Sequence, residues 1–145
     1  PNLYDHLSGR EFLHFAAGLA GVDKKNIPAT AESLLDRVNL TESGDRRLRT
    51  YSKGMQQRLA LAQSLVGDPE LVIMDEPLSG LDPVGRMEIQ ELVASLRKQG
   101  KTIFFSSHIL SDVETICDRV ALIVKGEIKY DGTPENIQET FKEML

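Results

Sequence analysis

The sequence predicts an α/β fold in which the strands of a parallel sheet alternate with helices. Three short apolar runs rich in Val, Ile and Phe, residues 71–74, 102–106 and 120–124, are typical of strands that are covered on both faces. A helical pattern separates the first two runs, because Asp82 is a favourable N-cap and Gly100 lies just past the last apolar turn. The alternation indicates α/β architecture.

Ahead of these strands, residues 3–50 predict a small helical lobe. Ser8 and Glu11 have the spacing of a capping box, in which each side chain binds the other residue's backbone N–H. Apolar residues then recur at helical spacing as far as Gly21, which suits a left-handed helix end. A second helix is expected after Pro28, and a polar, turn-rich stretch bounds the lobe.

The remaining elements follow from local signals. Ser52 begins another amphipathic helix, which a Gly-Asp-Pro turn at residues 67–69 closes. A turn at residues 125–126 predicts a terminal hairpin. Thr133 and Pro134 begin a last helix at the end of the chain.

Composition excludes several function classes. The chain has 145 residues, enough for one domain, with 41% hydrophobic and 27% charged residues as in ordinary globular proteins. A net charge of −5 without a basic stripe argues against nucleic acid as a partner. The single Cys117 fits a reducing, cytosolic compartment, and no apolar run approaches the ~20 residues that cross a bilayer. A membrane role would therefore need a partner.

Two adjacent acids carry the strongest chemical signal. Asp75 and Glu76 directly follow the apolar run 71–74, at the carboxyl end of a predicted parallel strand, where open α/β sheets bind ligands. Their side chains point different ways, so one can hold a metal while the other handles a water. On these six residues alone, an acidic turn after a strand explains the pattern equally well.

A histidine ends the next strand along the chain. His108 follows the run 102–106, and the ends of successive strands converge in an α/β sheet, so we expect His108 near Asp75 and Glu76. A lone histidine is more often structural, but its place at a strand end favours a functional role.

The third element is the start of the helix at Ser52. A serine with Gly54 at a helix N-terminus exposes a hydroxyl and free N–H groups where the helix dipole favours an anion. Taken singly, an ordinary serine cap with a flexible glycine is the better interpretation.

Together, the three elements resemble ABC ATPase domains in order and spacing along the whole chain. Residues 51–55 are similar to the family signature Leu-Ser-Gly-Gly-Gln, Asp75 and Glu76 to the Walker B pair, residues 79–82 to the D-loop, and His108 to the switch histidine. The residues within these motifs look most like those of the ATPase subunits of ABC-2 type exporters. Lys53, Met55 and Leu78 depart from the commonest pattern, without removing a group that the chemistry needs.

The resemblance implies a fold and a division of the chain. It implies a partial P-loop NTPase core of the RecA type, with a parallel sheet and an α-helical signature subdomain. Residues 1–66 would form the helical subdomain and residues 67–145 the C-terminal part of the core, within a single incomplete domain. The P-loop strand would lie between strands 102–106 and 120–124, so its absence would leave unpaired apolar edges that favour association.

The resemblance also implies a mechanism with ATP and Mg²⁺ as ligands. Asp75 would help to hold Mg²⁺, Glu76 would orient the attacking water, and His108 would contact the γ-phosphate as a second catalytic residue. The residues assigned to binding ATP are Ser52, Lys53, Gly54, Met55, Gln56 and Asp82. Two such domains, identical or different, would face each other head to tail and drive a transmembrane permease subunit from the cytoplasmic face of the membrane.

One motif of the family is not found among these residues. The nearest match to Gly-x-x-x-x-Gly-Lys-Ser/Thr is the stretch 95–102, which has Ser95 in place of the first glycine. It also runs from a helix into a strand, whereas a P-loop runs from a strand into a helix. We therefore expect Lys101 at the surface, and the P-loop and Q-loop upstream. Without them, no measurable ATP hydrolysis by these residues alone is expected.

Two other functions remain open at this point. An ABC-family ATPase of translation or DNA repair would keep the chemistry and change the partner, although such proteins usually carry two ATPase domains or long coiled coils. A non-catalytic module would only supply a signature face to another ATPase. The sequence specifies neither the transported substrate, the direction of transport nor the membrane subunit.

Overall fold

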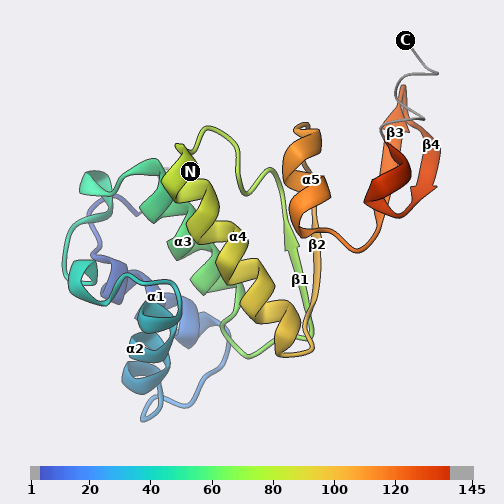
Figure 1. The fold of residues 1–145 in the computed structure, drawn as a ribbon. Coiled ribbons are helices and arrows are strands. Elements are labelled where there is room, and N and C mark those ends of the chain that lie inside the picture. Colours follow the sequence, from blue (N-terminus) through green and yellow to red (C-terminus); the bar gives the residue numbers. More distant parts are fainter. Residues whose placement is uncertain (1–3, 138–145) are drawn as a thin grey trace. The chain divides into compact units, whose positions relative to one another are not determined.

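The computed structural model describes residues 4–137 and divides the chain into two compact units, Pro1–Ser106 and Ser107–Leu145. The first unit holds the helical lobe and two strands, and the second holds a short helix and a hairpin (Figure 1). The two units are compact parts of the chain and do not correspond to the predicted subdomains. The boundary expected between residues 66 and 67 therefore stays a prediction.

Three helices of unit 1 pack against one another: α1 (Gly9–Leu19), α2 (Ile27–Arg37) and α3 (Lys53–Ser64). The predicted capping box is confirmed, since the Ser8 hydroxyl accepts from the Glu11 N–H at 3.1 Å and the Glu11 carboxylate accepts from the Ser8 N–H at 2.7 Å. Gly21 ends the first helical segment with φ +79°, a conformation that suits glycine.

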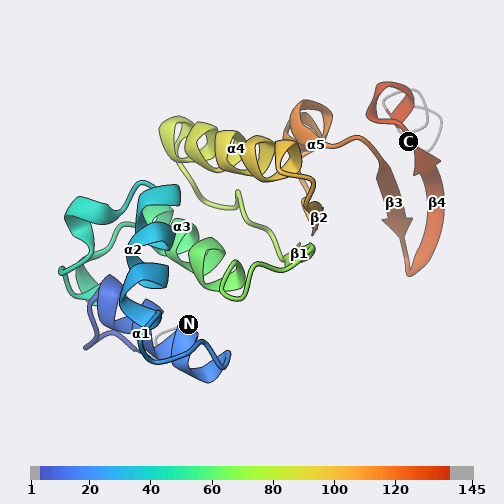
Figure 2. The ribbon, with the colours of Figure 1, turned by 90° about the horizontal axis from the view of Figure 1, so that it is seen from below.

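The sheet of unit 1 is a pair of parallel strands, β1 (Leu71–Met74) and β2 (Thr102–Phe105). Helix α4 (Pro83–Lys98) connects them and lies against β2 and α3 (Figure 2). Its start is confirmed, because the Asp82 carboxylate accepts from the Gly85 N–H at 2.8 Å. The connection is the βα-crossover unit that parallel strands require.

One core joins the lobe to the sheet. The fully buried side chains of Leu35, Leu65, Val72 and Leu96 belong to a single cluster to which α2, α3, β1 and α4 all contribute. The orientation of the lobe is therefore tied to the strands by continuous apolar packing within unit 1.

Within the described part of unit 1, only one face of this strand pair is covered. Leu71, Ile73 and Phe104 are 51%, 67% and 65% exposed, and Ile73 lies opposite Phe104 in the register. The expectation that both faces are buried is therefore wrong for the described part of unit 1. The Val- and Ile-rich runs predicted the strands correctly, but the second covering layer does not come from these residues.

Unit 2 contains α5 (Leu110–Ile116) and the antiparallel strands β3 (Val120–Val124) and β4 (Glu127–Gly132). The predicted hairpin is confirmed: Lys125 and Gly126 have φ of +51° and +83°, as in the turns that match strand twist. Among the described residues β3 pairs with β4 only, so its expected parallel neighbour is not observed.

A short 3₁₀ turn at Pro134–Asn136 begins where the last helix was predicted, and residues 138–145 of that helix lie outside the described range. Within residues 4–137, no helix combines the length and apolar character needed to span a membrane.

Candidate functional site

The carboxyl ends of β1 and β2 bring the two predicted acids to one serine. The Ser106 hydroxyl donates to the Asp75 carboxylate at 2.6 Å and accepts from the Glu76 N–H at 2.9 Å. The Ser106 N–H in turn donates to the Met74 carbonyl at 3.1 Å, extending the ladder between the strands. Ser106 therefore fixes both the side chain of Asp75 and the backbone of Glu76. In the sequence, Ser106 is only the last residue of a predicted strand. Its role depends on the parallel pairing of β1 and β2, which puts its hydroxyl beside Asp75 and Glu76.

Glu76 stands at a sharp turn of the backbone. Its φ is +48°, a left-handed value that costs a residue with a side chain about 1–2 kcal/mol. The Ser79 N–H donates to the Glu76 carbonyl at 3.1 Å, and the buried Pro77 and Leu78 anchor the segment that follows. The turn redirects the chain from β1 toward α4 and leaves Glu76 at the edge of the sheet.

A hollow of about 200 Å³ lies beside Asp75, between β1, α3 and α4. Its walls are mainly apolar, and its polar groups come from Asp75, Gln57 and Ser64. The hollow is smaller than the ~300–1,000 Å³ of typical small-molecule pockets, so by itself it identifies no ligand.

The start of α3 is the second group of predicted site residues. Ser52 caps the helix, with its hydroxyl accepting from the Met55 N–H at 3.2 Å, and both Ser52 and Lys53 are exposed. The cap confirms the predicted helix start and leaves the first N–H groups of α3 at the surface, where an anion could reach them.

The same helix end packs against the Ser79–Asp82 turn. The Lys53 side chain lies over Gly80, because a Cβ added at Gly80 would be 3.2 Å from Lys53 Cε and nearer still to Nζ. A Cβ at Gly54 would be 3.9 Å from the side chain of Leu81. The start of α3 and the Ser79–Asp82 turn are therefore in contact, a proximity that the sequence motifs do not predict.

His108 belongs to unit 2, beyond the end of β2 at Phe105. Asp75, Glu76 and Ser106 are brought together within unit 1. The expected proximity of His108 to the two acids, which lie in the other unit, stays a prediction.

The expectation of a surface lysine at position 101 is wrong. Lys101 Nζ donates to Asp68 Oδ1 at 2.6 Å and to the Pro69 carbonyl at 2.7 Å, and its side chain is only 9% exposed. This hydrogen bond lowers the pKa of the Asp68 carboxyl. Asp68 and Lys101 lie just before β1 and β2. Because these strands are parallel neighbours, their starts lie side by side and bring the two residues together. The structure confirms that the segment runs from helix to strand.

The acids offer oxygen ligands suited to Mg²⁺. Asp75 carries a carboxylate next to the Ser106 hydroxyl, and Mg²⁺ is commonly held by one or two carboxylates together with water and phosphate oxygens. Over residues 4–137, no group of three or more His, Cys, Asp or Glu side chains could hold a metal ion. An ion at this edge would therefore depend on Asp75 and on the oxygens of a bound phosphate.

A parallel strand pair ending in acids, with a capped helix end presented in the same unit, is typical of nucleotide-binding α/β proteins. More particularly, the chain belongs to the ABC transporter family, whose sequence profile matches residues 1–79.

Named relatives are similar over most of the chain. An uncharacterized ABC transporter ATP-binding protein of Nostoc sp. is 49% identical over an alignment of 143 positions that covers 94% of this chain and 42% of that protein. The fluoroquinolones export ATP-binding protein of Mycobacterium tuberculosis is 42% identical over 95% of this chain and 44% of its own length. The lantibiotic transport ATP-binding protein SrtF of Streptococcus pyogenes is 39% identical, over 100% of this chain and 63% of its own length. The chain thus spans roughly half the length of these relatives.

Proposed function

We propose that the complete protein containing this chain is the ATP-hydrolysing subunit of an ABC exporter. The observation that carries the proposal is Ser106, which holds Asp75 and the backbone of Glu76 at the carboxyl edge of the parallel strands. Family membership supports ATP as the ligand, and relatives named for the export of fluoroquinolones and the transport of lantibiotics support export.

In this proposal the acids divide the chemistry at the γ-phosphate. Asp75, oriented by Ser106, would help to hold Mg²⁺, which would supply charge neutralisation at the phosphates when bound. Glu76 orients and polarises the attacking water, a role worth about 10²–10⁴ in rate. His108 contacts the γ-phosphate from its own segment.

The exposed start of α3 binds the ATP held by a second ABC domain. Free N–H groups and the positive end of the helix dipole favour the γ-phosphate there, and Lys53 adds a positive charge. The residues assigned to this contact are Ser52, Lys53, Gly54, Met55 and Gln56. Asp82 caps α4 and belongs to the same turn as Gly80, against which Lys53 lies. In this proposal Asp82 couples the two ATP sites.

The partners follow from the family. ABC transporter ATP-binding subunits work with transmembrane components, and we propose that residues 3–50 dock on a permease subunit at the cytoplasmic face of the membrane. Two ATPase domains, identical or different, would close on ATP and open after hydrolysis. Residues 1–145 by themselves would not hydrolyse ATP, because phosphoryl transfer relies on the phosphate cradle and lysine of a P-loop.

A magnesium titration of the ATPase activity tests the role of Asp75. In the complete protein, Asp75→Asn is expected to raise the Mg²⁺ concentration for half-maximal activity about 10–100-fold, the range seen when an outer ligand of a metal is lost. Glu70→Gln is the matched control, because Glu70 is exposed and precedes β1 at the opposite end of the strand. An unchanged magnesium requirement in Asp75→Asn would remove Asp75 from the metal site.

The contact between Lys53 and Gly80 makes a second prediction. Gly80→Ala places a methyl group where the Lys53 side chain lies, at a backbone φ of +67°. We expect a stability loss of about 1–2 kcal/mol from the left-handed backbone, together with a several-fold higher KM for ATP because Lys53 must move.

Gly21→Ala separates these two effects. Gly21 has a similar φ of +79°, and a Cβ there would meet nothing within 4 Å. The two variants should shift the urea midpoint alike, and only Gly80→Ala should change KM. Equal KM values in both variants would show that the position of Lys53 does not affect ATP binding.

A further inference from the structure

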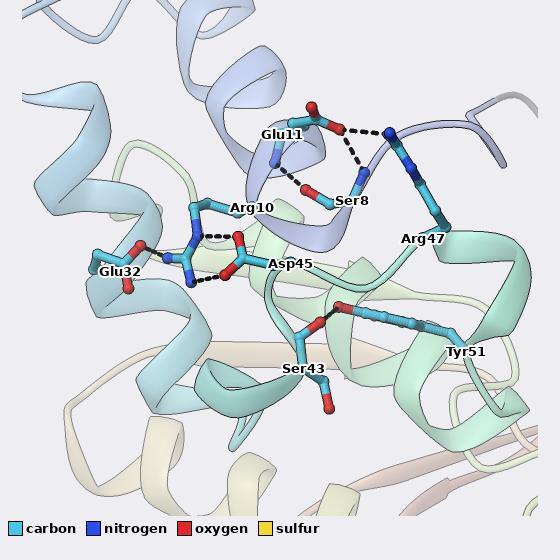
Figure 3. Close-up of polar contacts among 8 residues, drawn as sticks. All are labelled: Ser8, Arg10, Glu11, Glu32, Ser43, Asp45, Arg47 and Tyr51. Carbon is cyan, nitrogen blue, oxygen red and sulfur yellow. Dashed lines mark hydrogen bonds and ion pairs between the residues drawn. The ribbon is translucent and has the colours of Figure 1, made fainter.

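The residue that precedes Ser52 is held by a buried hydrogen bond. The Tyr51 side chain is only 6% exposed, and its hydroxyl donates to the Ser43 carbonyl at 2.8 Å (Figure 3). Burial raises the pKa of the Tyr51 phenol, so the hydroxyl remains a donor throughout the physiological pH range. Tyr51 is thereby attached to the turn at residues 43–47, which we call the lobe turn.

Helix α1 fixes the lobe turn and touches the same tyrosine. The Arg10 N–H donates to the Gly44 carbonyl at 2.8 Å, and the Gly9 N–H donates to the Arg46 carbonyl at 3.4 Å. A Cβ added at Gly9 would be 3.1 Å from Tyr51 Cζ and closer to its hydroxyl oxygen. Only a glycine at position 9 leaves the end of the tyrosine ring in its place.

Charged groups tie the lobe turn to two helices. The Arg10 guanidinium binds both oxygens of the Asp45 carboxylate, at 2.9 and 3.4 Å, and also pairs with Glu32 of α2 (Figure 3). The Arg10 hydrogen bond lowers the pKa of the Asp45 carboxyl, so the pair stays charged near neutral pH. The Arg47 guanidinium donates to the Glu11 carboxylate of the capping box at 3.1 Å. The position of the lobe turn therefore depends on the positions of α1 and α2.

The link from Tyr51 to Ser52 is short and extended. Tyr51 has φ −72° and ψ 138°, and Ser52 has φ −64° and ψ 163°, after which α3 begins. With the tyrosine ring anchored at its hydroxyl and packed in the core, the backbone that carries the Ser52 hydroxyl has little freedom.

We propose that Tyr51 is a positioning residue, which transmits the orientation of α1 and α2 through the lobe turn to the Ser52 hydroxyl. The inference rests on the proposed function, in which Ser52 binds the ATP of a second domain and the lobe contacts a permease subunit. Tyr51 then links the docking surface to the phosphate contact without touching ATP itself.

Steady-state ATPase kinetics of the complete protein test this role. Tyr51→Phe keeps the ring and removes the hydrogen bond to Ser43. We expect KM for ATP to rise about three- to ten-fold, the range of one net hydrogen bond, with kcat per active site within about two-fold. Gly9→Ala places a methyl group against the hydroxyl end of the same ring and is expected to raise KM in the same way.

Tyr130→Phe is the matched control. Its hydroxyl also donates to a backbone carbonyl, that of Thr133 at 2.7 Å, but in unit 2. This variant should keep the KM of the unchanged protein. Thermal unfolding of each variant shows whether it is folded. If Tyr51→Phe does not fold, the KM of Gly9→Ala tests the inference in its place.

The outcomes separate the inference from the function on which it rests. Unchanged KM in Tyr51→Phe and Gly9→Ala, with a lower melting temperature or a smaller active fraction, would mean that Tyr51 is only structural. An equal rise of KM in Tyr130→Phe would also overturn the inference. If the unchanged protein hydrolyses no ATP, the proposed function fails and the inference fails with it.

Discussion

Replacing Glu76 with glutamine in the complete protein is expected to lower kcat for ATP hydrolysis about 10²–10⁴-fold. Glutamine has the size of glutamate, so the turn between β1 and α4 and the bond from the Glu76 N–H to Ser106 should both persist. What is lost is the negative carboxylate that, in the proposed function, polarises the attacking water. KM for ATP should change little, because Asp75 and the start of α3 are untouched.

Single-turnover and steady-state ATPase measurements on the same preparation check this result. Glu91→Gln, the same change at an exposed position of α4, should leave both kcat and KM unaltered. A Glu76→Gln protein that turns over ATP at an undiminished rate would remove Glu76 from the catalytic role.

The largest expected loss of stability comes from truncating Leu96. Its side chain is 0% exposed in α4 and belongs to the cluster that contains Val72 of β1 and Leu35 of α2. Leu96→Ala leaves a cavity where the lobe, the helix and the sheet meet, so the free energy of unfolding should fall by about 2–5 kcal/mol. Urea unfolding of the complete protein measures it, as a lower midpoint of the transition that includes this domain.

Leu19→Ala is the control, because it is the same leucine-to-alanine truncation at an exposed position. Leu19 ends α1 with 74% of its side chain exposed, so the same truncation should shift the midpoint by less than about 0.5 kcal/mol. Equal shifts in the two variants would contradict the existence of one core shared by lobe and sheet.

The elements of the fold could be predicted because their signals are local. The helix at residues 83–98 has its cap at Asp82 and its end before Gly100 within its own sequence, and both were confirmed. What covers a strand is not local. The run 71–74 has the composition of a strand buried on both faces, yet Ile73 is exposed because burial depends on which other segments pack there. The run 120–124 likewise predicts a strand without specifying its partner.

The site shows the same limit. Asp75 and Glu76 stand out because they directly follow an apolar run, and Ser52 because it begins a helix. Ser106 cannot be predicted as a functional group from the sequence, because its hydrogen bonds depend on the register between β1 and β2. The contact of Lys53 with Gly80 depends on the packing of two segments that are distant in sequence, which spacing within a motif cannot reveal.

The left-handed backbone at position 76 means that this position is not optimised for folding. Glycine adopts φ +48° without strain, so a glycine there would relieve the backbone strain of the turn, about 1–2 kcal/mol. The same replacement would remove the carboxylate at the edge of the sheet. Under the proposed function, a replacement that relaxes the backbone at this position would therefore lower ATP hydrolysis.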